Sequence, residues 1–242
     1  YSIYKYLISY YSGNPISINS LILPALLGKP FYHLWYLYMI IGLYLFTPFL
    51  NLMIPKIPVR ATWSMAFVFL GIGMVNSFFD SYFNNKVFFL LWFINYLGYY
   101  MLGYLISKSK IRYPSSSLLI IYFLSSSLIA VLTYFTIKYF DSLYFYSYLS
   151  PPVIIASLSF YKIFQQANFK ENILSKIAPL TLGIYLIHSG LLDFLNYQIK
   201  IKNISFVQNP LWAIPLKSLI VFSISFVLAF LLYKVKFIRR LI

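Results

Sequence analysis

The chain has 242 residues, of which 61% are hydrophobic and only 10% are charged. A soluble domain carries about 25% charged residues, so this composition excludes a soluble globular protein and predicts a membrane protein. There is no cysteine, which excludes disulfides, thiolate nucleophiles and Cys-ligated metal sites. The net charge of +15 arises from 19 Lys and Arg against 4 Asp and Glu, and its meaning depends on where these residues lie along the chain.

Long apolar blocks bounded by charged residues or proline predict an all-α fold, a polytopic transmembrane helical bundle. Helices are expected because backbone groups in lipid must be hydrogen-bonded within their own segment. Residues 1–30 are predicted to be extracytoplasmic or interfacial, since their apolar stretch is too short to cross a bilayer. The transmembrane domain then covers 31–233, followed by a basic tail, 234–242. Its seven predicted spans are residues 31–52, 61–79, 87–107, 115–137, 146–164, 177–197 and 211–233.

The positive charges are divided unevenly between the two sides of these spans. Twelve Lys and Arg residues lie in the loops after the first, third and fifth spans and in the tail, against seven elsewhere. Basic residues accumulate on the cytoplasmic side, so we expect a cytoplasmic C-terminus and an extracytoplasmic Tyr1. The charge then marks topology, and no nucleic-acid partner is needed to explain it. The twelve are Lys56, Arg60, Lys108, Lys110, Arg112, Lys162, Lys170, Lys176, Lys234, Lys236, Arg239 and Arg240.

Two histidines are the first candidates for chemistry, because ionisable residues at membrane depth are costly and mark functional sites. His188 lies near the middle of the sixth predicted span, and is either a proton-handling residue or a hydrogen-bonded structural one. Tyr185 shares its helical face, whereas Asp193 lies on a neighbouring face. His33 lies at the predicted outer mouth of the first span, where it is either an interfacial residue or a substrate-binding one.

Other ionisable residues have simpler interpretations. Asp80 and Asp193 end spans on the predicted outer side, where a solvated carboxylate and a functional one are the alternatives. Lys217, in the last span, is close enough to the outer edge to snorkel to water. The third span has no acidic counter-ion, which argues against a retinal Schiff-base protein. With two histidines and few acids, we expect no metal site.

Four short motifs occur in order along the chain. They are H-L-W-Y-L from His33 with T-P at Thr47, Y-L-G-Y-Y-M-L-G-Y from Tyr96, L-G-I-Y-L-I-H ending at His188, and an apolar last span with a basic tail. Together they resemble the acyltransferase-3 family of integral membrane proteins, and more narrowly its surface-polysaccharide O-acetyltransferase branch. The resemblance extends over most of the chain from Leu27 onward.

The resemblance implies transfer of an acyl group, acetyl in the first instance, from cytoplasmic acetyl-CoA or another acyl-CoA to a glycan hydroxyl. The acceptor would be a cell-surface or lipid-linked saccharide, at a bacterial plasma membrane, with membrane lipids as further partners and no bound cofactor. Family members have about ten spans with both ends cytoplasmic, so three spans are expected upstream of Tyr1. The Arg and His of the family's first span have no counterpart here, because the sequence begins after them.

The resemblance also suggests roles for particular residues. His188 and His33 are the predicted catalytic residues, since an imidazole can remove the proton of an attacking hydroxyl. The predicted substrate-binding residues are Tyr32, Trp35, Tyr36, Tyr185 and Asp193. Basic residues of the inner loops would attract the phosphates of CoA, although topology and anionic lipids explain them as well. A lipid or glycan transporter or flippase, and an inactive truncated fragment, are the alternative interpretations.

Overall fold

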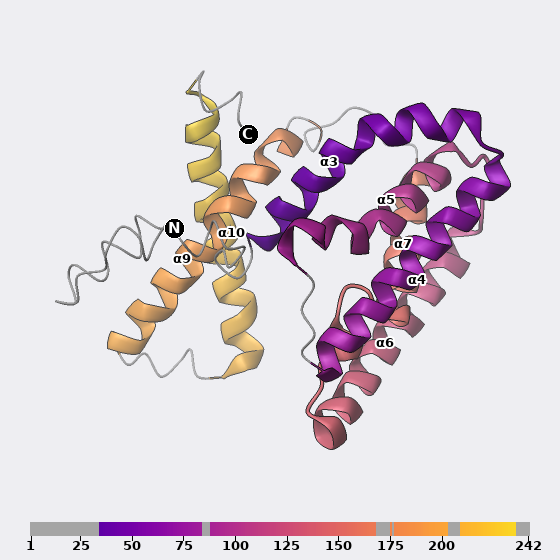
Figure 1. The fold of residues 1–242 in the computed structure, drawn as a ribbon. Coiled ribbons are helices and arrows are strands. Elements are labelled where there is room, and N and C mark those ends of the chain that lie inside the picture. Colours follow the sequence, from indigo (N-terminus) through magenta and orange to yellow (C-terminus); the bar gives the residue numbers. More distant parts are fainter. Residues whose placement is uncertain (1–33, 84–87, 168–174, 176, 203–208, 236–242) are drawn as a thin grey trace. The chain divides into compact units, whose positions relative to one another are not determined.

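The computed structural model describes residues 34–83, 88–167, 175, 177–202 and 209–235 of the chain (Figure 1). Within these residues the regular secondary structure is helical throughout, and no strand occurs among them. The chain divides into two compact units, one of them Trp35–Asn168 and the other Tyr1–Leu34 with Phe169–Ile242. The predicted all-α helical bundle is confirmed.

The described residues of the unit Trp35–Asn168 form five α-helices. Prolines set several boundaries, because Pro has no backbone N–H and fits best at the start of a helix. Pro151 and Pro152 open one helix, while Asp141 ends another in a left-handed conformation with φ 48°. The elements are α3 Trp35–Met53, η1 Ile54–Lys56, α4 Val59–Phe83, η2 Phe89–Leu91, α5 Trp92–Lys108, α6 Ser115–Phe140, η3 Tyr144–Tyr146 and α7 Pro151–Gln166.

Helices α4 and α5 cross at close range. A Cβ atom at Gly73 would collide with the backbone oxygen of Asn95, and one at Gly98 would collide with the backbone nitrogen of Leu70. Small residues of this kind let helix backbones approach one another in membranes. The contact continues into the buried core of the unit, which comprises Met39, Leu43, Leu50, Ala66, Leu70, Leu97, Met101, Leu102, Leu105 and Ile154.

The second unit is described through η4 Ala178–Leu180, α9 Thr181–Lys202 and α10 Pro210–Tyr233. Helix α10 begins with Asn209, whose side chain accepts a hydrogen bond of 3.0 Å from the backbone N–H of Leu211. Helices α9 and α10 pack against each other. Lys217 of α10 donates a hydrogen bond of 3.1 Å to the side chain of Asn196 on α9, so its ammonium group is held at this helix pair.

Six helical segments of the described chain are long and apolar enough to cross a membrane. They correspond to six of the predicted spans, and their outward side chains are largely apolar and exposed. The remaining predicted span, 146–164, corresponds to η3 and the 16-residue α7, which is shorter than the roughly 20 residues of a typical crossing. Helix α4 extends to Phe83, so Asp80 lies inside the helix rather than after it.

Candidate functional site

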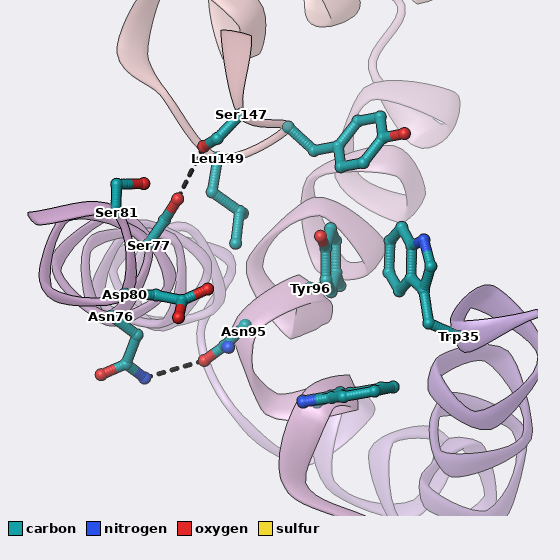
Figure 2. Close-up of a pocket in the computed structure, with 11 residues that line it drawn as sticks. Trp35, Asn76, Ser77, Asp80, Ser81, Asn95, Tyr96, Ser147 and Leu149 are labelled. Carbon is teal, nitrogen blue, oxygen red and sulfur yellow. Dashed lines mark hydrogen bonds between the residues drawn. The ribbon is translucent and has the colours of Figure 1, made fainter. Parts of the chain in front are cut away.

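A cavity of about 410 Å³ lies where the last turns of α4, the first turns of α5 and the turn before α7 meet (Figure 2). One wall is polar and the other is aromatic. This cavity is called the Asp80 cavity, and its lining consists of Trp35, Asn76, Ser77, Asp80, Ser81, Trp92, Asn95, Tyr96, Ser147, Tyr148 and Leu149.

The polar wall comes mainly from one face of α4. Asn76, Ser77, Asp80 and Ser81 follow the spacing that places residues one helical turn apart on the same side. Figure 2 shows the carboxylate of Asp80 directed into the space between α4 and Tyr96. Asp80 is solvent-exposed, so its carboxylate is accessible to a ligand that enters the cavity.

Two side-chain hydrogen bonds join this face of α4 to the neighbouring segments. Asn76 donates to Asn95 of α5 through its Nδ2 atom, with an N–O distance of 2.8 Å. The hydroxyl oxygens of Ser77 and Ser147 lie 2.6 Å apart. These bonds place an amide pair and a hydroxyl pair on either side of Asp80, as Figure 2 shows. These two hydrogen bonds therefore fix the polar groups of the cavity, which come from α4, α5 and the turn before α7.

The aromatic wall is centred on Trp35 at the start of α3. Its ring lies 5.5 Å from that of Tyr96 and 5.5 Å from that of Tyr148, with interplanar angles of 34° and 36°. Trp92 meets Trp35 edge-on at 6.5 Å. The hydroxyl of Tyr99 donates a hydrogen bond of 2.9 Å to the carbonyl oxygen of Tyr148, which fixes the turn carrying Tyr148. The aromatic rings thus lie opposite the carboxylate of Asp80 and the amides of Asn76 and Asn95. Ligand pockets commonly combine apolar surface with a few polar groups that orient the ligand.

In the other unit, His188 lies near the middle of the segment Ala178–Ile199. Its Nδ1 atom is 2.7 Å from the carbonyl oxygen of Tyr185, and the two rings are 5.8 Å apart. A carbonyl oxygen only accepts hydrogen bonds, so Nδ1 carries a proton and donates it to this oxygen. In a neutral imidazole with this tautomer Nε2 is the basic nitrogen, the atom that a proton-abstracting histidine uses.

The structure places the predicted site residues as follows. Trp35 lies in the Asp80 cavity, whereas Tyr36 is 37% exposed and does not line it. Tyr185, His188 and Asp193 all lie on α9, in the other unit. His33 and Tyr32 are outside the described residues. The roles assigned to these residues from the sequence stay predictions.

Most of the polar cavity wall was not selected from the sequence. From the sequence, Asp80 is a span-end acid with two interpretations, and Asn76, Ser77, Asn95 and Ser147 are not among the predicted site residues. The available signal was the spacing of four polar residues at the end of an apolar span, Asn76, Ser77, Asp80 and Ser81. It indicates a polar helix face, but it does not identify the segments that this face meets.

Of the comparisons with known proteins, the one with protein families gives a match. A family model described as an acyltransferase domain matches residues 1–234 of the chain. No curated protein and no solved structure gives a significant match. The matched range includes every helix described above and all residues of the Asp80 cavity.

Proposed function

The chain belongs to this acyltransferase family, and on that premise we propose that it is a membrane O-acyltransferase whose acceptor binds in the Asp80 cavity. The donor is an acyl-CoA on the cytoplasmic side, acetyl-CoA in the first instance. The acceptor is a hydroxyl group of a cell-surface or lipid-linked glycan. The positive-inside distribution of charge supports an extracytoplasmic position for the cavity, the side on which the proposal expects such a glycan.

The observation that supports this proposal is the opposition of two unlike walls in one cavity. A sugar ring has an apolar face of C–H groups and a rim of hydroxyls. Trp35 and Tyr96 offer ring surface to the face, while the carboxylate of Asp80 accepts hydrogen bonds from hydroxyls on the rim. Hydrogen bonds to an ionised group are roughly twice as strong as neutral ones. Asp80 therefore supplies the main polar contribution to acceptor binding in this proposal.

His188 lies in the other unit, and its assignment as the general base is a separate proposal that rests on its own hydrogen bond and on membership of the family, not on the Asp80 cavity. With its Nδ1 proton donated to the Tyr185 carbonyl oxygen, Nε2 takes the proton of the attacking hydroxyl as its oxygen bonds to the acyl carbon. The C–S bond of the thioester then breaks, and the proton held by the imidazole passes to the departing thiolate. The products are an acylated glycan and free CoA, with no other reactant needed.

The test uses proteoliposomes containing the full chain and acetyl-CoA labelled in its acetyl group. Purified surface glycan from the cell that encodes the chain is the acceptor, and protein-free liposomes are the control. Label that enters the glycan as base-labile ester supports the proposal. Movement of glycan across the bilayer without incorporation of label would instead identify a transporter, and absence of both would contradict acyl transfer.

A further inference from the structure

Two further cavities lie along α5 beside the Asp80 cavity. A cavity of about 310 Å³ lies between α3 and α5 and shares Tyr96 with the Asp80 cavity. A third, of about 370 Å³, shares Tyr99 and Tyr100 with the second and reaches Ser107 at the far end of α5. We call the second and third cavities together the tyrosine groove, after Tyr96, Tyr99, Tyr100 and Tyr104 of α5. At about 1.5 Å per residue the groove follows α5 for about 16.5 Å from Tyr96 to Ser107.

Three of the tyrosines that line the groove use their hydroxyls within the protein. The Tyr100 hydroxyl lies 2.8 Å from the hydroxyl of Thr47, and that of Tyr99 donates to the Tyr148 carbonyl. Tyr161, on the far wall, donates a hydrogen bond of 3.3 Å to the Gly103 carbonyl oxygen. What these side chains offer to a ligand is therefore mainly the surface of their rings.

The opposite wall of the groove, formed by α3 and η1, is mainly apolar and includes the neutral amide of Asn51 in the third cavity. Met39, Ile40 and Leu43 of α3 face α5 across the second cavity. Among the described residues that line the groove, none carries an acidic or basic side chain. A path for ions or protons at membrane depth is normally marked by ionisable side chains. The groove is thus suited to a hydrocarbon chain rather than to a polar solute.

We propose that the tyrosine groove holds the hydrocarbon chain of a lipid-linked acceptor while its sugar occupies the Asp80 cavity. The Asp80 cavity and the groove share Tyr96 as a lining residue, so the sugar and the chain of one amphiphile would lie on neighbouring sides of this ring. The groove runs along membrane-spanning helices, where the surrounding medium is itself hydrocarbon. This inference rests on the proposed function and narrows it, because it selects a lipid-linked saccharide over a free polysaccharide as the acceptor.

The first test does not depend on catalysis. An alkyl glucoside with a sixteen-carbon chain and a mid-chain diazirine is bound to the full chain in nanodiscs, irradiated, and the labelled residues are identified by mass spectrometry. Labelling should concentrate on the groove, at Ile40 and Tyr99, and exceed that at Ile41, which is 57% exposed on the same helix and lines no part of the groove. Equal labelling of Ile41, or absence of label from Ile40 because a protein segment already fills the groove, would overturn the inference.

The second test uses the Ile40→Trp variant, which fills the groove, and Ile41→Trp as its matched control. Ile40→Trp should raise the KM for the long-chain glucoside by about tenfold and leave the KM for methyl glucoside unchanged, whereas Ile41→Trp should change neither. An equal effect of Ile40→Trp on both acceptors would contradict a chain-binding groove. If neither acceptor is acylated, the proposed function fails, and the labelling experiment alone decides whether the groove binds a chain.

Discussion

Asn76 of α4 donates a hydrogen bond of 2.8 Å to the side-chain oxygen of Asn95 on α5. The bond crosses the interface at which Gly73 lets the two backbones approach, and Asp80 lies one helical turn further along α4. The position of Asp80 relative to Trp92 and Tyr96 on α5 therefore depends on this pair. The hydrogen bond between Asn76 and Asn95 thus connects the packing of α4 on α5 with the geometry of the Asp80 cavity.

We expect the Asn76–Asn95 bond to contribute measurably to the stability of the unit. A double-mutant cycle with Asn76→Ala and Asn95→Ala, measured by unfolding in mixed detergent micelles, should give a coupling free energy of about 0.6 to 1.7 kcal/mol, the range known for side-chain bonds between membrane helices. The single variants serve as controls for the loss of each amide alone. A coupling indistinguishable from zero would show that the two amides do not hold the helices together.

Gly73→Ala should destabilise the protein, because the added methyl group meets the backbone oxygen of Asn95, which no side-chain rotation relieves. Forced overpacking of this kind costs about 1 to 3 kcal/mol. Gly71→Ala is the matched control, since a Cβ atom there has no neighbour within 4 Å. The measurement is the free energy of unfolding of the two variants, which should be lower for Gly73→Ala than for Gly71→Ala. An equal effect of the two substitutions would contradict the close α4–α5 crossing.

Trp35→Leu should weaken acceptor binding more than it affects the chemical step. The substitution removes the ring that contacts Tyr96 and Tyr148, and each aromatic pair contributes about 0.5 to 1.5 kcal/mol. The expected result is a KM for the acceptor raised by about tenfold with little change in kcat. Trp212→Leu, on α10 and 69% exposed, controls for loss of a tryptophan. An unchanged KM in Trp35→Leu would remove this ring from the acceptor site.

The sequence allowed the fold class to be predicted, because apolar blocks of span length have few alternatives in a membrane. Trp35, selected from the sequence as a substrate-binding residue, lines the Asp80 cavity, and its binding role stays a prediction. The polar wall was missed because it is assembled by tertiary contacts: Ser147 comes from a turn some 70 residues from Ser77. Since α4 continues to Phe83, Asp80 belongs to a helix face, whereas the composition of the segment suggested that the span ended before it.

His188 should be essential for turnover if it is the general base. His188→Asn keeps an N–H that can donate to the Tyr185 carbonyl oxygen but lacks the basic Nε2 atom. Loss of a general base lowers kcat by about 100- to 10,000-fold, and the acceptor KM should stay near that of the unmodified protein. Tyr197→Phe, at an exposed position on the same helix, is the control. Turnover retained in His188→Asn would assign His188 a structural role.

The most direct test of the central claim, that the Asp80 cavity binds the acceptor, compares two neutralised carboxylates in the labelled acyl-transfer assay. Asp80→Asn keeps the size of the side chain and removes its charge, and Asp141→Asn does the same at an exposed site outside the cavity, where Asn tolerates the left-handed backbone. Hydrogen bonds to a charged group contribute about 1.5 to 3 kcal/mol, so kcat/KM for the acceptor should fall by about 10- to 100-fold in Asp80→Asn and stay unchanged in Asp141→Asn. Equal kcat/KM values in the two variants would contradict the assignment of the cavity as the acceptor site.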